Sequence, residues 1–288
     1  MKGAVVFHRG ALGDSILVWP LLRALANKYA MVVLVSDLAK AQLAQRVAVP
    51  NLVVLSAENA LFNRLYVEGA NVEAVEAATN IDLVLNLAPL QLQTGELVST
   101  WERNAKKQYP RARIVVERRQ LDRVLALELA EKWGTVRPTP PALVPVSPTA
   151  CFFVGAGSAE KRWPLPFWVQ LKNACPHLAV SMIAGEAEED RFSPAERKMF
   201  AGAGGVFLKS LVELEAALRV SAMFVGVDSG PTHLAGQMGL DTVALFGPTD
   251  PQRWAPIGPR VRVISPEFRR GMAWLKVEKV SELLVSLR

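Results

Sequence analysis

The sequence predicts an α/β protein built from two Rossmann-like domains whose parallel sheets face a cleft. Short apolar runs, of the kind that a parallel sheet covered on both faces requires, alternate with segments of helical period along the chain. A proline-rich stretch at 137–149, "RPTPPALVPVSPT", interrupts this alternation, which then starts again. Because proline fixes φ and removes an amide donor, we expect this stretch to link two domains.

The N-terminal domain is expected over residues 1–140, where strands and helices alternate as βαβ units. The helices carry apolar residues at i, i+3, i+4 and i+7, as in "DSILVWPLLRALANKY" at 14–29. The apolar runs predict strands at 3–8, 31–36, 52–56, 82–87 and 112–117.

The C-terminal domain is expected over 150–265, and the helical segment that follows at 266–288 is expected to pack back toward the N-terminal domain. The strands of this second domain are predicted at 151–154, 179–185, 206–209, 223–228, 242–247 and 261–265. Ligands of open α/β sheets bind beyond the carboxyl ends of the strands. The loops expected to line the cleft are therefore those at 9–14, 155–163, 185–190 and 228–233.

The composition is that of a soluble globular protein, with 51% hydrophobic and 21% charged residues among 288. Two cysteines without a CxxC pair give little support to a disulfide framework or a zinc site. The N-terminal apolar run is too short for a secretion signal, and no apolar run approaches the roughly 18 residues of a membrane span. We therefore expect a cytoplasmic protein.

The net charge of +6 is concentrated between residues 101 and 123, where eight Lys or Arg residues stand against three acids. Such a segment suits an anionic partner, and it is equally typical of a solvated surface. No recognisable nucleic-acid-binding module accompanies the charge, so we expect no nucleic-acid partner.

The loop "HRGALGDS" contains the first candidate catalytic residue, Asp14. Two interpretations are open. Asp14 is well placed as an N-cap that accepts amide hydrogen bonds, and it is also a carboxylate that could act as a general base toward the cleft. The two roles oppose each other, because a helix N-terminus stabilises the charged carboxylate and so weakens it as a base.

The loop "GAGSAEKRWP" at 155–164 is glycine-rich, but Glu160 stands where a dinucleotide fingerprint needs its third glycine, and no Walker A loop is present. A glycine-rich turn with Lys161 suits an anion held by backbone amides and one ammonium group. An ordinary surface lysine is the alternative.

The stretch "VGVDSGPTHLAG" ends a strand at Asp228 and starts a helix at Pro231, so its turn is a candidate phosphate site. A hydrolase triad of Asp228, Ser229 and His233 is disfavoured because the GxSxG elbow is absent. In "AGEAEED" at 184–190, Glu186 either favours the helix N-terminus or accepts ribose hydroxyls. No DxD motif is present, which disfavours a metal-dependent sugar transferase.

These pieces together resemble one family, the ADP-heptose:lipopolysaccharide heptosyltransferases of glycosyltransferase family 9, which have the GT-B fold. The resemblance is carried by "RGALGDSILVWPLLRALANKY", "GAGSAEKRWPLPFWVQL", "VDSGPTHLAGQMGLDTVALFGPTDPQRWAP" and "RRGMAWLKVEKVSELL", and it spans nearly the whole chain.

The resemblance implies that Asp14 deprotonates the acceptor hydroxyl and that Glu186 contacts the nucleoside. It assigns the donor phosphates to Lys161, Asp228, Ser229, Gly230, Thr232 and His233. The reaction it implies is inverting and needs neither metal nor cofactor. Acceptor contacts are expected in the N-terminal domain, from Arg9, Gly13, Arg103, Arg118 and Arg119.

The expected function is transfer of heptose from ADP-heptose to an anionic glycolipid acceptor, the Kdo–lipid A type of lipopolysaccharide inner core. The alternatives are a related transferase with another nucleotide sugar or acceptor, and a sugar-nucleotide-binding protein without catalysis. We expect a monomer, with peripheral contact to the cytoplasmic face of the inner membrane. The chain is shorter than is usual for the family, and we expect the N-terminal domain, where the acceptor binds, to be the shortened part. Ser229 stands where threonine is frequent in the family, and it keeps the hydroxyl group.

Overall fold

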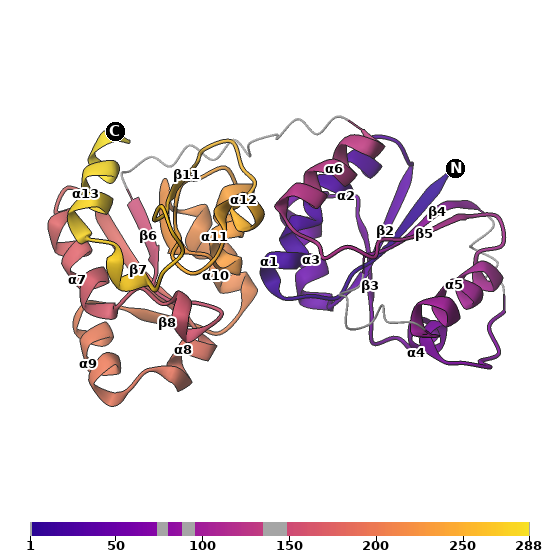
Figure 1. Cartoon of the computed structure of the whole chain (residues 1–288), viewed down its shortest axis with the longest axis horizontal. Coiled ribbons are helices and arrows are strands. Elements are labelled where there is room, and N and C mark those ends of the chain that lie inside the picture. Colours follow the sequence, from indigo (N-terminus) through magenta and orange to yellow (C-terminus); the bar gives the residue numbers. More distant parts are fainter. Residues whose placement is uncertain (1, 74–79, 88–95, 135–148, 288) are drawn as a thin grey trace. The chain divides into compact units, whose positions relative to one another are not determined.

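The computed structural model describes residues 2–73, 80–87, 96–134 and 149–287 (Figure 1). It divides into two compact units, Met1–Arg137 (unit 1) and Pro138–Arg288 (unit 2). The boundary falls at the start of the proline-rich stretch, three residues before the end expected for the first domain. Most of that stretch, 137–148, lies outside the described residues.

Unit 1 is a five-stranded parallel sheet with the strand order β3-β2-β1-β4-β5. Its strands are β1 (Gly3–Phe7), β2 (Met31–Ser36), β3 (Val53–Ser56), β4 (Ile81–Asn86) and β5 (Arg113–Val116). Its helices are α1 (Leu12–Leu17), α2 (Trp19–Ala26), α3 (Leu38–Val47), α4 (Ala60–Asn63), η1 (Arg64–Tyr66), α5 (Glu96–Gln108) and α6 (Arg123–Trp133). Every residue of β1 is buried, as the continuous apolar run predicts for a central parallel strand.

Aromatic residues hold the core of unit 1 together on one face of its sheet. The ring of Phe7 meets those of Phe62 and Trp101 edge to face, with centroids 5.5 Å and 5.4 Å apart. These contacts join β1 to α4 and α5, and edge-to-face packing adds roughly 0.5–1.5 kcal/mol per pair beyond burial. They fix the end of β1, from which the first candidate loop departs.

Unit 2 is a six-stranded parallel sheet with the order β11-β10-β9-β6-β7-β8. Its strands are β6 (Thr149–Phe153), β7 (Ala179–Gly185), β8 (Val206–Leu208), β9 (Met223–Val227), β10 (Asp241–Leu245) and β11 (Val261–Ile264). Its helices are η4 (Ala159–Lys161), α7 (Leu165–Ala174), α8 (Glu186–Arg191), α9 (Pro194–Gly202), α10 (Leu211–Arg219), α11 (Gly230–Gln237), α12 (Pro251–Trp254), η5 (Met272–Trp274) and α13 (Val277–Ser286).

The two parallel sheets confirm the predicted α/β class. Each predicted strand is present within the described residues, with its ends displaced by no more than one or two positions. The strands at 31–36 and 179–185 coincide with their predictions.

The C-terminal segment packs into unit 2. Its helix α13 buries Val277, Val280 and Leu284 in the core of unit 2, where it packs against α7. The three residues share one face at helical spacing, and that face is filled by the unit's own core. The segment is therefore a structural part of unit 2. Within the described chain, no helix is both long enough and apolar enough to span a bilayer.

Candidate active site

The strand order of each unit reverses at one point, and ligands of doubly wound sheets bind beside that point. In unit 2 the chain passes from β6 to β7 and β8 on one side, then returns to β9 beside β6 and continues to β10 and β11. The loops that follow β6 and β9 therefore leave the sheet in different directions. They are the glycine-rich loop that ends in η4 and the turn that opens α11.

A partly buried ion pair joins these two loops. The Lys161 ammonium lies 2.8 Å from Oδ2 of Asp228, which directly follows β9. The Asp228 side chain is only 8% exposed, whereas that of Lys161 is 26% exposed, so part of the lysine side chain remains accessible. Asp228 thus fixes the position of a cation at the switch point. Both residues had been assigned to the donor phosphates from the sequence, and the structure adds that they are paired with each other.

The turn at the start of α11 is closed by its own hydroxyls. Thr232 Oγ1 donates to the carbonyl of Val227 at 2.5 Å and lies 3.1 Å from Oγ of Ser229. The amides of Thr232 and His233 both donate to the carbonyl of Ser229. Gly226 makes this turn possible, because a Cβ there would lie 2.5 Å from Thr232 Oγ1. Ser229 stands at the N-cap position without a side-chain capping bond, so its hydroxyl is not committed to the helix amides.

His233 is buried beneath the same turn. Burial lowers its pKa to about 4, against the opposing effect of Asp228, and Lys161 lowers it further. Its Nε2 lies 3.9 Å from Oδ1 of Asp228, which is too far for a hydrogen bond. Nδ1 has no hydrogen-bond partner among the described residues. At neutral pH His233 is therefore an uncharged imidazole with one polar atom unused, and it brings no positive charge to the site.

Two glutamates of the loop after β7 have different surroundings. Glu186, which the sequence assigned to the nucleoside, is exposed at the first position of α8. Glu188 is buried, and its carboxylate accepts the amides of Ala156 at 3.2 Å and Gly185 at 3.1 Å. A Cβ on Gly155 would lie 2.6 Å from that carboxyl group. Glu188 therefore shapes the loop after β6, a role that sequence reasoning missed.

The C-terminal segment braces two loops at the same edge of the unit 2 sheet. Trp163 Nε1 donates to the carbonyl of Leu275 at 3.0 Å, and Trp274 Nε1 donates to that of Phe246 at 3.2 Å. Trp163 follows the glycine-rich loop, and Phe246 follows β10. The C-terminal segment thereby helps to hold the loop of Lys161 in place.

Unit 1 has its own switch point, between β1 and β4. Asp14, the candidate base, lies at the third position of α1 and accepts the amide of Ala11 at 3.2 Å. Ala11 is the N-cap residue, so Asp14 reaches back to the helix start and is not itself the cap. Gly13 is the residue before it in the same turn, and Lys40 of α3 donates to the carbonyl of Gly10 at 2.8 Å.

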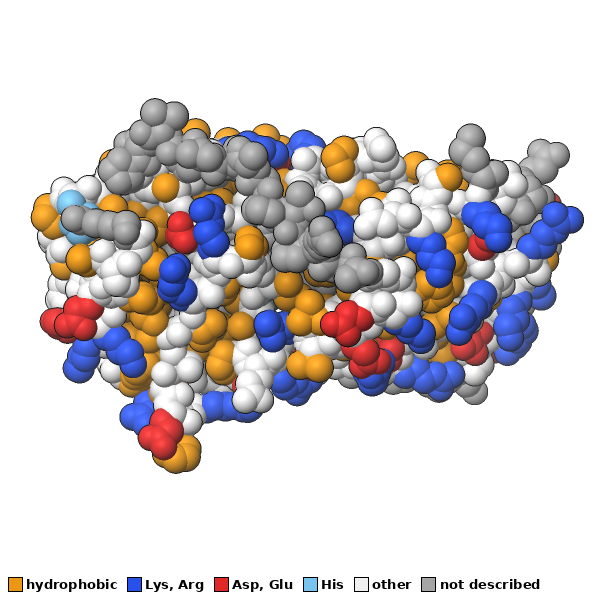
Figure 2. Space-filling view, turned by 90° about the horizontal axis from the view of Figure 1, so that it is seen from above, with side chains coloured by type: hydrophobic (Ala, Val, Ile, Leu, Met, Phe, Trp, Pro, Cys, Tyr) orange, Lys and Arg blue, Asp and Glu red, His pale blue; other side chains and the backbone are white. Residues whose placement is uncertain are grey.

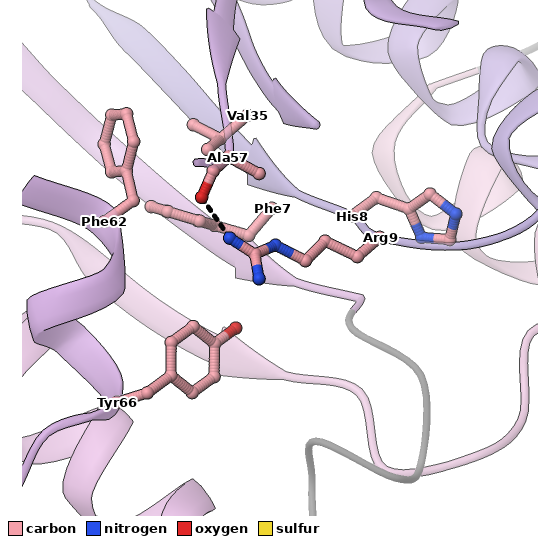
Figure 3. A pocket seen from close by; sticks show the side chains of 7 residues that line it. All are labelled: Phe7, His8, Arg9, Val35, Ala57, Phe62 and Tyr66. Carbon is pink, nitrogen blue, oxygen red and sulfur yellow. Dashed lines mark hydrogen bonds between the residues drawn. The ribbon is translucent and has the colours of Figure 1, made fainter. Parts of the chain in front are cut away.

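Beside this loop lies a small pocket lined by Phe7, His8, Arg9, Val35, Ala57, Phe62 and Tyr66 (Figure 3). The guanidinium of Arg9 crosses it, donating to the carbonyl of Ala57 and to Asn63 Oδ1, the latter at 2.9 Å. Burial raises the pKa of the Tyr66 hydroxyl, partly offset by a hydrogen bond with Asn86 and by the charge of Arg9. Arg9 is thus a fixed cation in a partly apolar pocket.

The basic segment at 101–123 is divided by the fold. Lys106 and Lys107 end α5 and Arg113 begins β5, so these cations lie at the amino edge of the sheet. Arg118 and Arg119 follow β5 at the carboxyl edge, the edge to which Asp14 belongs. Figure 2 shows Lys and Arg side chains gathered on the part of the surface that unit 1 forms.

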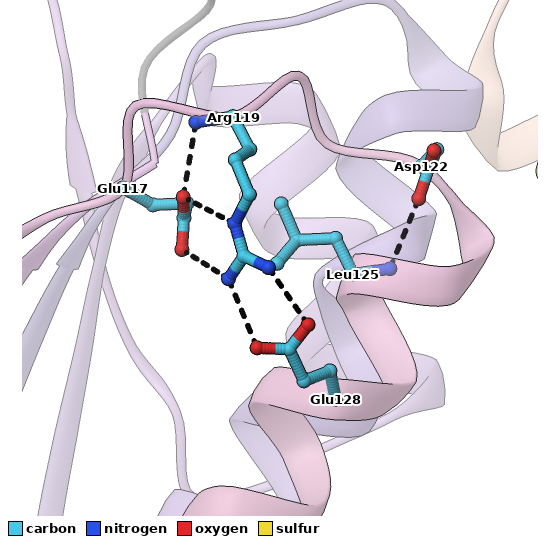
Figure 4. A network of polar contacts seen from close by, with 5 residues as sticks. All are labelled: Glu117, Arg119, Asp122, Leu125 and Glu128. Atoms are coloured by element: carbon cyan, nitrogen blue, oxygen red, sulfur yellow. Dashed lines mark hydrogen bonds and ion pairs between the residues drawn. The ribbon is translucent and has the colours of Figure 1, made fainter.

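Arg119 is occupied by a polar network of its own (Figure 4). Its guanidinium donates to the carboxylates of Glu117 and Glu128 at 2.8–3.0 Å. These bonds raise the pKa of Arg119 and lower those of both glutamates. Arg103 lies 3.9 Å from the carboxylate of Glu68 with both side chains mostly exposed, and Arg118 is exposed. Of the expected acceptor contacts, Arg9 and Gly13 lie in or beside the loop of Asp14.

The chain is similar in fold to solved glycosyltransferases. A family 9 glycosyltransferase from Veillonella parvula has a TM-score of 0.68 at 19% identity, over 100% of this chain and 98% of the other. E. coli heptosyltransferase WaaC, solved with ADP, has a TM-score of 0.66 at 15% identity, with both chains covered completely. E. coli ADP-heptose lps heptosyltransferase II has a TM-score of 0.65 at 18% identity, over 100% and 98%. The two parallel sheets match those of GT-B heptosyltransferases.

The chain belongs to glycosyltransferase family 9. The model of that family, described as glycosyltransferase family 9 (heptosyltransferase), matches residues 19–281. The protein is therefore a glycosyltransferase of the heptosyltransferase family. No curated protein sequence matches the chain.

Proposed function

We propose that this glycosyltransferase moves heptose from ADP-heptose to an anionic glycolipid of the lipopolysaccharide inner core, with inversion and without a metal. The observation that carries the proposal is the Lys161–Asp228 pair beside the N-terminal turn of α11, at the point where the unit 2 sheet reverses. A fixed ammonium and a helix N-terminus together favour a diphosphate. Two similar proteins support the choice of nucleotide, because E. coli heptosyltransferase WaaC was solved with ADP and the second is an E. coli ADP-heptose lps heptosyltransferase.

In this proposal the donor diphosphate lies between Lys161 and the turn that opens α11. The amides of Ser229 and Gly230 and the Ser229 hydroxyl contact the phosphate oxygens, since the next two amides are bonded within the turn. Thr232 maintains the turn through its bond to Val227, and the neutral His233 offers a hydrogen bond without charge. The ammonium of Lys161 and the helix dipole stabilise the negative charge that develops on the departing diphosphate. In metal-dependent sugar transferases a metal ion has this role.

Asp14 is the proposed general base. Its carboxylate takes the proton of an acceptor hydroxyl as the acceptor oxygen bonds to the anomeric carbon, and the bond to the diphosphate breaks with its electron pair leaving on the phosphate. Attack from the face opposite the leaving group inverts the anomeric configuration. The reach of Asp14 toward Ala11 orients the carboxylate.

Glu186 is the proposed nucleoside contact. It is exposed, and it directly follows β7, which is the neighbour of β6 in the sheet. A ribose bound beside η4 would present its hydroxyls on this side, where a carboxylate accepts two hydrogen bonds. Glu188 is already engaged with backbone amides and is not assigned to the ligand.

The acceptor is assigned to unit 1. Arg9 supplies a cation beside the loop of Asp14, with Gly13 close to the same carboxylate, and Arg103 and Arg118 extend the positive surface. Arg119 contributes least, since two carboxylates occupy its guanidinium. We place the protein in the cytoplasm, in peripheral contact with the membrane that holds the glycolipid.

Thermal unfolding with a panel of nucleotides tests the donor assignment. A ligand at 100 times its Kd stabilises the folded state by about 2.7 kcal/mol. ADP and ADP-heptose should raise the unfolding temperature more than UDP, GDP or NAD, and the shift should survive EDTA. An equal or larger shift with UDP would overturn the adenine assignment, and loss of the shift in EDTA would overturn metal independence.

A further inference from the structure

His8 has a buried ring nitrogen that the proposed mechanism leaves unused. The residue follows β1 and is 3% exposed. Its Nδ1 lies 3.0 Å from the carbonyl oxygen of Leu87, just after β4. A carbonyl only accepts hydrogen bonds, so Nδ1 carries the hydrogen and Nε2 carries the lone pair. In the part of the chain that the structure describes, the buried Nε2 has no hydrogen-bond partner.

Nε2 of His8 and the candidate base Asp14 both lie beside Gly10. A Cβ built on Gly10 would lie 2.9 Å from His8 Nε2, 2.9 Å from Asp14 Cβ and 3.3 Å from Asp14 Oδ2. The two side chains therefore flank the same small space, which Gly10 keeps open. In Figure 3 the ring of His8 points away from Arg9 and the rest of the pocket.

The surroundings keep His8 neutral. Burial lowers its pKa to about 4, the bond to Leu87 opposes this, and the charge of Lys40 lowers it further. The charged groups that face it are Asp14 on α1 and Lys40 on α3, while Arg9 donates to Ala57 and Asn63. A neutral imidazole with Nδ1 protonated can only accept at Nε2.

We propose that His8 is a positioning residue for Asp14. Nε2 of His8 accepts a hydrogen bond from the Asp14 carboxyl group after that group has taken the acceptor's proton. The inference rests on the proposed role of Asp14 as base. The acceptor O–H bond breaks, its proton joins the Asp14 carboxylate, and the new O–H donates to the lone pair of His8. The proton then returns to water when the products leave. Without this bond the buried Nε2 of His8 would have no hydrogen-bond partner among the described residues.

Two substitutions separate this role from a structural one. His8→Asn places an amide nitrogen near the position of Nδ1, so it keeps the bond to Leu87 and loses the acceptor at Nε2. His8→Gln places its amide oxygen near the position of Nε2, so it keeps an acceptor beside Asp14 and loses the bond to Leu87. The positioning role predicts that His8→Asn lowers kcat about tenfold or more with an unchanged donor KM, and that His8→Gln stays within about threefold of wild type.

A purely structural role predicts the opposite order, with His8→Gln the worse variant in both unfolding temperature and kcat. That order, or equal kcat values, would overturn the inference. The failure of the base assignment is recognised separately, because Asp14→Asn would then keep its turnover whatever the His8 variants do.

Gly10→Ala gives a second test if both His8 variants fail to fold. Its methyl group would enter the space between Nε2 and Asp14, so kcat should fall while ADP affinity stays unchanged. Gly202→Ala in α9 is the matched control, because a Cβ there meets nothing within 4 Å. Equal kcat for the two alanine variants would contradict the proposed contact.

Discussion

The two switch points of this protein are built differently. That of unit 2 holds a charged pair, Lys161 and Asp228, with hydrogen bonds that close the adjoining turn. That of unit 1 holds a carboxylate and a neutral imidazole around an open glycine. A fixed cation binds an anion in every turnover, whereas a base must change its protonation state. The roles proposed for the two units follow this difference, with binding of the donor assigned to unit 2 and proton transfer assigned to unit 1.

The largest expected effect comes from removing the base. Asp14→Asn should lower kcat by about 10²-fold or more, because an amide cannot accept the hydroxyl proton. ADP affinity, measured by calorimetry, should remain within about twofold, since the donor groups are assigned to unit 2. Full turnover in this variant would leave Asp14 as a helix-start residue only.

Lys161→Ala should give the reverse pattern. A hydrogen bond to a charged group contributes about 1.5–3 kcal/mol, so ADP affinity should fall about 10-fold to 100-fold. Lys172→Ala is the matched control, because Lys172 lies on α7 and its ammonium donates to the carbonyl of Ala203, the residue after α9. If the ADP affinities of the two variants agree, Lys161 has no role at the diphosphate.

The buried histidines should make the protein sensitive to acid. The folded-state pKa values of His8 and His233 lie at about 4, below their ordinary value of 6.5. Between these values the unfolded chain binds more protons than the folded one, so stability is complete above about pH 6.5 and falls as the pH approaches 4.

Urea unfolding from pH 7 to pH 4 measures this effect. In wild type, the free energy of unfolding should fall between pH 7 and pH 4. His8→Asn should reduce this fall by up to about 3 kcal/mol, since one pKa unit corresponds to about 1.36 kcal/mol. A slope identical to that of wild type would show that His8 titrates normally.

The smallest effect is expected at the basic surface. Arg119→Ala should change the acceptor KM by less than about twofold, because its guanidinium is already paired and exposed ion pairs contribute little. Arg9→Ala, by contrast, should raise the acceptor KM several-fold. A larger change for Arg119 than for Arg9 would move the acceptor toward the end of β5.

The sequence predicted the parts of this fold that depend on local pattern. The strands at 31–36 and 179–185 are mostly apolar runs, and they were placed without error. The start of α1 was misplaced, because the helix begins at Leu12 and contains Gly13, so Asp14 lies inside the first turn.

Contacts between distant segments could not be read in the same way. Lys161 and Asp228 are 67 residues apart, and only the strand order brings β6 beside β9. Among the four acids at 186–190, the pattern does not say which one turns inward, and Glu188 is buried while Glu186 is exposed. A helical segment at 266–288 was expected, but the partner of its helix α13, which is α7, was not.

The most direct test of the proposed function is transfer itself. The protein is incubated with ADP-heptose and a Kdo–lipid A acceptor, and the product is followed by mass spectrometry, with Asp14→Asn as the matched control. We predict that the acceptor gains the mass of one heptose, that ADP is released in equal amount, and that the control gives no product. Binding of ADP without transfer from any nucleotide sugar in a panel would contradict this function.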